Sequence, residues 1–382
     1  MTSTAALQPE TSAQPRYEIL DGLRGVAAVL VILYHFGEGF ATSAVDQMMN
    51  HGYLAVDFFF VLSGFVIGYA YDRCWKNKGM TTGRFMLRRI IRLQPMVVLS
   101  VIIGAIAYLL QGSVHWDGTP VPFHWVLVAL ILGLFMIPVL PGAAADVRGN
   151  GEMFPLNGPT WSLFFEYIGS VLYAVILHRL SKNGLRTVVA VSGIGLAACA
   201  LCNMSGAFHL GVGWSMADMG WLGGFLRLSL SFGIGLMLTR DFRPMRIRGA
   251  FWICAALITV IMSCPYIGST DGNPSIANGV YDIICTLLIF PTIVYIGACG
   301  TTSDIFSSKV CEFLGAISYP VYIIHYPVMY MFYAWVWNNG ITFADAWPVC
   351  MALFVVIILE AWIAMKWYDA PIRRYLSRKL LH

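Results

Sequence analysis

ILDGLRGVAAVLVILYHFGEGF, at residues 19–40, is an apolar stretch with few ionisable side chains. At about 1.5 Å per residue, a helix of this length crosses a hydrocarbon layer about 30 Å thick. Further apolar runs follow it between polar breaks, so the sequence predicts an all-α, polytopic membrane helix bundle. These runs are 52–72, 95–112, 123–140, 160–178, 186–202, 220–239, 249–267, 279–299, 316–337 and 345–367.

The composition also indicates that lipid is the solvent of this chain. Of its 382 residues, 58% are hydrophobic and 12% are charged, against about 45–50% and about 25% in soluble domains. Residues 1–15 are polar and predict a flexible N-terminus without a cleaved signal peptide. The polar connections are short, so we expect no soluble domain and place any chemistry in or beside the membrane.

Charge and cysteine content exclude several classes of function. A formal charge of +4 is too small to predict a nucleic-acid partner. The nine cysteines lie mostly in apolar segments, which is typical of small packing residues. No histidine and acid pair recurs at the short helical spacing of metal ligands, so we expect no metal site.

Lysine and arginine predict the topology, because they concentrate in cytoplasmic loops. Three apolar runs lie between the first two basic clusters, where an even number of crossings is required. The run 123–140 is the best candidate for a re-entrant or interfacial helix, since Pro138 and Pro141 break its end. We therefore expect about ten transmembrane helices with both termini cytoplasmic. The basic clusters lie at 73–92, 179–186, 240–248, 309 and 373–379.

Arg24 and His35 are the first candidates for chemistry. Their separation of eleven residues brings both to one helix face, about 16 Å apart along the axis. Arg24 is expected near the cytoplasmic surface and His35 deep in the membrane. Alone, Arg24 is explained as a snorkelling anchor and His35 as a packing residue. Together on one face, ionisable residues in lipid favour a functional pathway.

A second candidate is the basic segment 82–95, which contains Arg88, Arg89 and Arg92. Arg89 and Arg92, three residues apart, share a helical face and form a fork that suits phosphate oxygens. The alternative is a topology signal whose partners are water or lipid phosphates. The sharper interpretation is a site for the diphosphate of a nucleotide or of coenzyme A.

Two buried acids stand next to small or aromatic residues. Glu166 follows Trp161 and lies four residues after Ser162, and it has a structural alternative as the partner of a distant arginine. Asp57 precedes Ser63 and its glycine neighbour, which suit close helix contact at least as well as catalysis.

Near the C-terminus, Ser318, Tyr319 and His325 share a span that contains Pro320 and Pro327. Prolines inside a helix predict a kink, which opens room for a pocket.

Taken in order, these motifs resemble the bacterial acyltransferase-3 family of integral membrane proteins. Arg24 and His35 match that family's signature of an arginine, ten residues and a histidine. Residues 16–377 are then expected to form the acyltransferase membrane domain, followed by a tail at 378–382. The further matches are FFFVLSGF at 58–65, RIIR at 89–92, WSL at 161–163 with Glu166, and SYPVYIIH at 318–325.

The resemblance implies about ten membrane helices and an inner (plasma) membrane enzyme that transfers acyl groups to sugar hydroxyls. The donor is commonly acetyl-CoA, a substrate rather than a bound cofactor. Acceptors in the family are surface polysaccharides, lipopolysaccharide, nodulation factors and macrolide sugars. Some relatives append an extracytoplasmic esterase-like domain, which we expect to be absent here.

The resulting hypothesis makes His35 the general base on the acceptor hydroxyl. Glu166 or Asp57 would orient its imidazole. Arg24, Tyr319 or His325 would donate to the charge that develops on the thioester oxygen. Acyl-CoA is expected to bind at Arg88, Arg89 and Arg92, helped by Arg24. The substrate pocket is expected to contain Trp161, Ser162, Ser63, Ser318, Tyr319 and His325.

Three alternatives stay open at this point. In the first alternative, a side chain of the protein carries the acyl group covalently across the membrane to the acceptor. A transporter or lipid flippase also uses membrane acids and histidines, but predicts inverted halves around a midplane site. A membrane scaffold leaves Arg24, His35 and Glu166 unexplained. Loops 111–123, 142–159 and 203–220 are expected outside the cytoplasm, where Trp116, Trp214 and His209 would anchor at the interface or stack on sugars.

Overall fold

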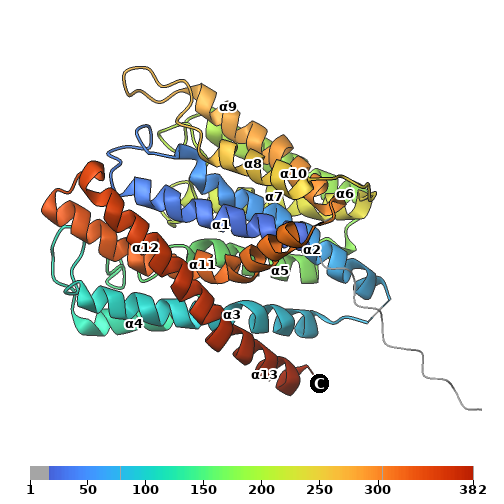
Figure 1. Cartoon of the computed structure of the whole chain (residues 1–382), viewed down its shortest axis with the longest axis horizontal. Helices are drawn as coiled ribbons and strands as arrows, with labels where there is room; N and C mark the ends of the chain where they lie inside the picture. The colour runs from blue at the N-terminus through green and yellow to red at the C-terminus, as the bar shows by residue number, and fades with distance from the viewer. Residues whose placement is uncertain (1–16, 78, 303, 382) are drawn as a thin grey trace, which may run out of the picture.

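The computed structural model describes residues 17–77, 79–302 and 304–381, and throughout these ranges the regular elements are helices (Figure 1). The predicted all-α class is confirmed, whereas the expected flexible segment 1–15 lies outside the described residues. The elements are α1 (Glu18–Glu38), η1 (Asn50–Leu54), α2 (Ala55–Lys76), α3 (Thr82–Leu110), α4 (Phe123–Leu134), α5 (Thr160–Val175), η2 (Leu177–Arg179), α6 (Lys182–Leu201), α7 (Gly220–Asp241), α8 (Ala250–Met262), α9 (Ile276–Ile284), η3 (Cys285–Ile289), α10 (Phe290–Cys299), α11 (Ile305–Asn339), α12 (Phe343–Ala364), η4 (Met365–Asp369) and α13 (Ala370–Leu380).

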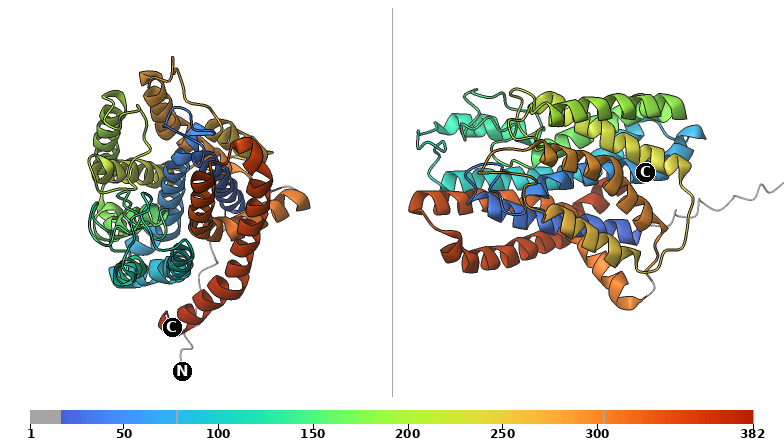
Figure 2. Two further views of the ribbon diagram at one scale, coloured as in Figure 1. Left: turned by 90° about the vertical axis from the view of Figure 1, so that its left-hand side faces the viewer. Right: turned by 90° about the horizontal axis from the view of Figure 1, so that it is seen from above.

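The bundle contains enough long apolar helices for a multi-pass membrane protein. Within the described ranges, seven continuous helical stretches have the length and apolar composition to cross a membrane, and α4 and α8 are shorter apolar helices. Most of the helices run along one shared axis, so they appear end-on when the molecule is turned (Figure 2). The number of crossings, expected to be ten, stays a prediction.

The segment expected not to span forms the short helix α4. Its 12 residues reach only about 18 Å, less than the thickness of a hydrocarbon layer. The helix ends at Leu134, before Pro138, because the chain turns at Met136, which has a φ of 54°. Gln94 of α3 donates to the carbonyl oxygen of Leu134 at 2.7 Å, which satisfies one of the free C-terminal acceptors of α4.

Two helix pairs form the centre of the molecule. α1 packs along α11, and α2 packs along α7. Close approach depends on glycine: a Cβ atom on Gly64 would lie 2.1 Å from the carbonyl oxygen of Phe232 in α7, and one on Gly25 would lie 2.4 Å from that of Leu314 in α11. Small residues commonly allow such contact between membrane helices. The α1–α11 pair brings Arg24 and His35 beside Ser318 and His325.

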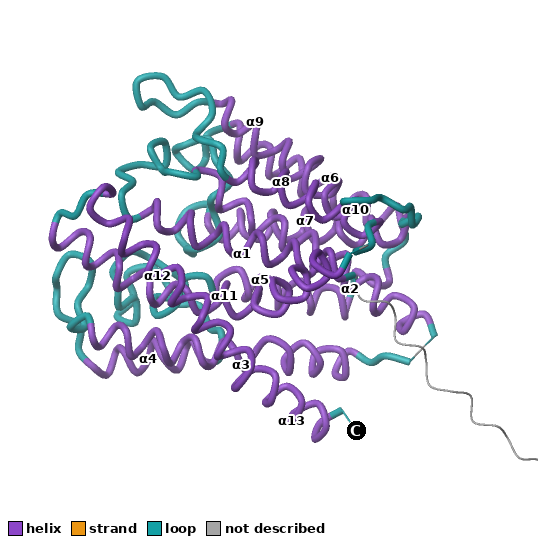
Figure 3. The backbone as a smooth tube through the Cα atoms, in the orientation of Figure 1, coloured by secondary structure: helices purple, strands orange, loops and turns teal. Residues whose placement is uncertain are grey.

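The two ends of the bundle carry opposite charge. Loops 39–49, 111–122, 135–159, 203–219 and 264–275 gather at one end, here called the outer end (Figure 3). In these loops Arg148 is the one lysine or arginine. The loops and helix ends at the opposite, inner end hold the arginine clusters of α3, α6, α7 and α13. This asymmetry predicts that the inner end faces the cytoplasm.

Candidate active site

Two cavities lie one behind the other between the helices. The outer cavity has a volume of about 300 Å³ and opens among the outer loops. The inner cavity has a volume of about 440 Å³ and contains the basic residues of α1 and α3. Val56 and Tyr322 line both cavities, so the two spaces meet at these side chains.

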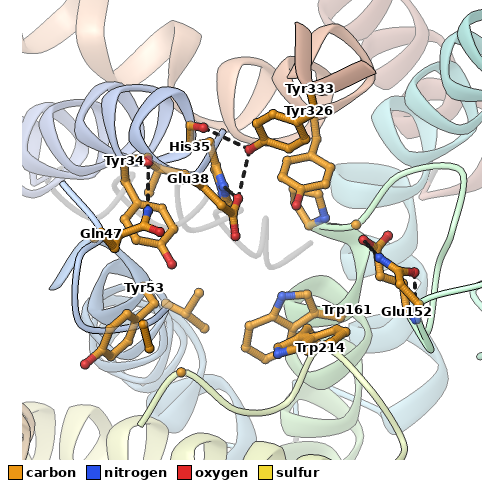
Figure 4. A pocket seen from close by; sticks show the side chains of 18 of the residues that line it. Tyr34, His35, Glu38, Gln47, Tyr53, Glu152, Trp161, Trp214, Tyr326 and Tyr333 are labelled. Carbon is orange, nitrogen blue, oxygen red and sulfur yellow. Dashed lines mark hydrogen bonds and ion pairs between the residues drawn. The ribbon is translucent and has the colours of Figure 1, made fainter. Parts of the chain in front are cut away.

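His35 and Glu38 form a hydrogen-bonded pair in the last turn of α1, on the wall of the outer cavity (Figure 4). The distance from His35 Nδ1 to Glu38 Oε2 is 2.7 Å, and the Tyr333 hydroxyl donates to the same oxygen at 2.8 Å. Because a carboxylate accepts, Nδ1 carries the hydrogen of this bond, and Nε2 is the acceptor nitrogen of the neutral imidazole. His35 therefore presents the atom that a general base needs, nearer the outer end than the sequence indicated.

The acids expected to orient His35 have other partners. Asp57 is fully buried against Arg227, whose Nε and Nη2 lie 3.1 and 2.7 Å from its two carboxylate oxygens. Glu166 accepts from Arg89 and from Ser63 in the inner cavity. The expectation that Glu166 or Asp57 orients the imidazole was wrong.

Arg227, which the sequence did not single out, supports the outer cavity. It is fully buried and also donates to the carbonyl oxygens of Val212 at 2.7 Å and Tyr53 at 2.9 Å. These bonds tie the outer loop 203–219 to η1. Asp57 therefore holds the arginine that shapes the cavity, rather than facing the cavity itself.

Aromatic rings form much of the wall of the outer cavity. In Figure 4, the rings of Trp161 and Trp214 lie below the cavity, opposite His35 and Glu38. Trp161, predicted as a pocket residue, lines this cavity. The large rings that line this cavity are Trp116, Trp161, Trp214, Trp337, Tyr34, Tyr53, Tyr322, Tyr326, Tyr330 and Tyr333.

A second carboxyl group, Glu152, comes from loop 135–159 and faces the same cavity (Figure 4). It is buried, accepts a hydrogen bond from Tyr330 and accepts another from Asn150 at 2.8 Å. Burial raises the pKa of the Glu152 carboxyl to about 7. Nearby, the Arg148 guanidinium stacks 3.5 Å from the centre of the Tyr330 ring. Glu152 and Arg148 lie in a loop without helical periodicity, so the sequence gives no spacing that predicts their place in the site.

His325 lies behind His35 and lines neither cavity. The two imidazole rings are 5.3 Å apart, and His325 Nδ1 lies 3.0 Å from the carbonyl oxygen of Val321, to which it donates. Its Nε2 is buried, with no hydrogen-bond partner among residues 17–77, 79–302 and 304–381. His325 is therefore a neighbour of the candidate base rather than a pocket residue.

The inner cavity brings together Arg24, Arg89 and Arg92. Arg24 donates to Ser318 Oγ at 2.9 Å and pairs with Asp21 at 3.0 Å, and Arg89 pairs with Glu166. Arg92 has no hydrogen bond or ion pair within the described part of the chain. Its guanidinium is free to bind an anion that enters this cavity.

Most of the other predicted residues also lie around the inner cavity. Ser63, Ser162, Ser318 and Tyr319 line it, whereas Arg88 lies outside the lining. The predicted residues thus divide between two spaces instead of forming one pocket. In the described ranges, no three histidine, cysteine or acidic side chains are grouped as metal ligands would be.

Comparison with known proteins places this arrangement in context. A family model described as an acyltransferase domain matches residues 17–366. The chain is similar to protein 2 in the picA locus of Rhizobium radiobacter, with 34% identity over 196 residues that cover 50% of this chain and 97% of that protein. No solved structure matches the chain.

Two further relatives are named as O-acetyltransferases. Peptidoglycan O-acetyltransferase OatA of Listeria monocytogenes is 25% identical over 373 residues, which cover 93% of this chain and 55% of that protein. A putative O-acetyltransferase of Staphylococcus aureus is 24% identical over 322 residues, which cover 81% of this chain and 50% of that protein. The chain therefore spans about half the length of these two relatives.

Proposed function

The chain belongs to the acyltransferase-3 family, and from this premise we propose that it is a membrane O-acyltransferase of the inner (plasma) membrane. It takes an acyl group, acetyl above all, from acyl-CoA and transfers it to a hydroxyl of a carbohydrate acceptor. The names of the two O-acetyltransferase relatives support the reaction. The observation that carries the proposal is the placement of His35 and the arginine cluster in two cavities that meet.

The inner cavity suits the donor. The diphosphate of coenzyme A is an anion that an arginine binds through charge-assisted hydrogen bonds. Arg92 is available for this contact, and Arg24 and Arg89 line the same space, held by Asp21 and Glu166. The thioester end of the donor then points toward Tyr322 and the outer cavity.

The His35–Glu38 pair suits the chemical step. His35 Nε2 takes the proton of the acceptor hydroxyl as its oxygen attacks the thioester carbonyl carbon. The carbon–sulfur bond then breaks, the electron pair leaves on sulfur, and His35 returns the proton to the coenzyme A thiolate. Glu38 holds the imidazole in the required tautomer and stabilises its positive charge.

The outer cavity suits a sugar. Aromatic faces bind the apolar faces of sugar rings, and the surrounding polar groups offer partners for hydroxyls. Trp161 and Trp214 supply the faces, and Glu152, Asn150 and Gln47 supply the polar groups. This composition supports a carbohydrate acceptor over a purely apolar one.

The test is release of free coenzyme A from acetyl-CoA by the purified protein with a panel of glycan and glycoside acceptors. Wild type is expected to show acceptor-dependent release, and His35→Ala is expected to lower kcat by about 10²–10⁴-fold while eluting as a folded protein. Equal release by both proteins would remove His35 from the mechanism. Vesicle uptake of a glycan without thioester cleavage would favour a transporter or flippase instead.

A further inference from the structure

Tyr322 stands between the two cavities. It lies on α11, is 8% exposed, and lines the outer cavity together with His35 and the inner cavity together with Arg24. Its ring packs edge-on against Phe59 of α2, with 5.2 Å between the ring centres. A group that passes from the arginines to His35 therefore passes Tyr322 and Val56, the two side chains that line both cavities.

Among the residues that the structure describes, one hydrogen bond holds the Tyr322 hydroxyl. The Tyr322 oxygen lies 2.7 Å from Ser162 Oγ, and Ser162 Oγ donates to the carbonyl oxygen of Pro159 at 3.0 Å. A serine hydroxyl has one hydrogen, so Tyr322 is the donor in the pair. Displacing Tyr322 from Ser162 leaves the bond to Pro159 intact and frees one donor where the two cavities meet.

The three donors expected for the thioester oxygen are engaged elsewhere. The Tyr319 hydroxyl donates to the carbonyl oxygen of Leu93 at 2.6 Å. His325 donates through Nδ1 to Val321, which leaves its Nε2 an acceptor. Arg24 lies about 16 Å from His35 along α1. Tyr322, which lines both cavities, is a further candidate donor to the thioester oxygen.

We propose that Tyr322 is a movable partition between the cavities and that its hydroxyl, released from Ser162, donates to the carbonyl oxygen of the incoming thioester. The proposal rests on the proposed function, with the donor in the inner cavity and the acceptor in the outer one. Before the thioester arrives, the closed side chain separates the cavities. After it arrives, the carbonyl oxygen replaces Ser162 as the hydrogen-bond acceptor.

The step balances without a further reactant. The acceptor oxygen attacks the carbonyl carbon while its proton moves to His35 Nε2, and the carbonyl electron pair moves onto the oxygen that Tyr322 faces. When the tetrahedral intermediate collapses, the pair returns, the carbon–sulfur bond breaks, and His35 protonates the sulfur. Tyr322 keeps its proton throughout and acts as a preorganised donor to the developing charge.

The partition can be tested without any enzymatic activity. Ser63→Cys places a thiol in the inner cavity, which no native cysteine lines, and the exposed or partly exposed Cys74, Cys202 and Cys264 are changed to serine so that this thiol alone is read. In vesicles with the outer end exposed, a small charged thiosulfonate is expected to leave this thiol unlabelled and to label it when Tyr322→Ala is added. Labelling from the inner end in both proteins reports that each is folded. The matched control is Tyr281→Ala, a tyrosine of α9 that lines neither cavity.

Two labelling results would overturn the partition. One is labelling from the outer end with Tyr322 intact, and the other is continued protection in Tyr322→Ala. Both labelling results are obtained without substrates, so they test the partition independently of enzymatic activity. If the wild type transferred no acyl group to any acceptor, that result would refute the proposed function and leave the partition standing.

The donor role is tested with Tyr322→Phe, which keeps the ring and removes the hydroxyl. The kcat of acetyl transfer is expected to fall by about 10²–10³-fold, as when one oxyanion donor is removed, with the acceptor KM changed by less than about threefold. Tyr281→Phe also removes a hydrogen-bonded tyrosine hydroxyl, one that donates to the carbonyl oxygen of Ile261 outside both cavities, and is expected to keep wild-type kcat. Wild-type kcat in Tyr322→Phe would refute the donor role.

Discussion

At the scale of single residues, Glu38 is the side chain that distinguishes this site from an isolated membrane histidine. Replacing it with glutamine keeps the size but removes the charge that stabilises protonated His35. We expect Glu38→Gln to lower kcat by about 10²-fold with little change in the acceptor KM, and Glu38→Asp to recover part of the loss. Steady-state kinetics with saturating acetyl-CoA measure this. A changed KM with an unchanged kcat would assign Glu38 to acceptor binding instead.

A second residue-scale prediction concerns pH. Burial raises the pKa of the Glu152 carboxyl from its ordinary value of 4.5 to about 7, so the folded protein favours the protonated form. Its contribution to stability is full below about pH 4.5 and is lost as the pH rises toward 7. We expect the unfolding temperature of the wild type to fall between pH 5 and pH 8, and Glu152→Gln to reduce that fall by a few degrees.

Asp46 supplies the control for this measurement. Hydrogen bonds from Thr42 and Ser43 lower the pKa of Asp46 to about 2, so it stays ionised between pH 5 and pH 8. Asp46→Asn is therefore expected to leave the pH dependence of unfolding in that range as in the wild type. The same slope in Glu152→Gln and wild type would contradict the assignment to Glu152.

What the sequence predicted at this scale depended on local spacing. Arg24 and His35 lie on one helix, so their shared face follows from helical geometry. Glu38 lies three residues after His35, so the same helical geometry places it beside the imidazole. The Asp57–Arg227 pair joins residues 170 positions apart. No spacing rule predicts such a contact.

At the scale of elements, the prolines of α11 need partners for the carbonyl groups they leave free. Pro327 has no N–H for the carbonyl oxygen of Ile323, and Asn157 Nδ2 donates to that oxygen at 2.9 Å instead. Asn157 also donates to Ser100 of α3 at 2.8 Å. One amide thus joins α3, α11 and the loop that leads into α5.

This contact gives the element-scale prediction. Asn157→Leu leaves the Ile323 carbonyl unsatisfied, which we expect to cost about 1–3 kcal/mol of unfolding free energy. In a Pro327→Ala background, the restored N–H of residue 327 pairs with Ile323, so the same substitution is expected to cost less. Thermal unfolding of the four proteins of this cycle in detergent measures the difference. Equal costs in both backgrounds would show that the Ile323 carbonyl does not depend on Asn157.

The sequence located the apolar parts of the helices better than their ends. α11 was expected from residue 316 but begins at Ile305, and α3 begins at Thr82 rather than at 95. Helical hydrogen bonding continues into polar turns beyond the apolar run when a side chain caps the first turn. Asp304 accepts from the amide of Ser307 at 2.7 Å, and Thr81 accepts from that of Arg84 at 3.2 Å.

At the scale of the whole molecule, the charge asymmetry predicts the side of the membrane from which the proposed acyl-CoA donor reaches the inner cavity. The inner cavity, which Arg24, Arg89 and Arg92 line, lies toward the inner end, and the basic residues predict that this end faces the cytoplasm. We expect sealed vesicles with the inner end exposed to release coenzyme A when acetyl-CoA is added outside. Vesicles of the opposite orientation are expected to do so only after permeabilisation. Release from both sealed preparations would place a donor site at the outer end.

The global arrangement was only partly predictable. The helical bundle follows from the apolar runs, and a non-spanning segment at α4 follows from the even number of crossings that the basic clusters require. The division of the predicted residues between two cavities does not, because it depends on which helices become neighbours. α1 lies along α11 through Gly25 and Leu314, a contact between residues that lie far apart in the chain.

The tryptophans of the outer cavity also give the protein an optical property. Four of its 12 tryptophans, Trp116, Trp161, Trp214 and Trp337, line that single space. Indole emission shifts to shorter wavelength when water around the ring is replaced and is protected from dissolved quenchers when the ring is covered. An unlabelled glycan that fills the cavity is thus expected to shift the intrinsic tryptophan emission to shorter wavelength and to reduce its quenching. Candidate acceptors can therefore be screened by tryptophan fluorescence, before any acyl donor is added.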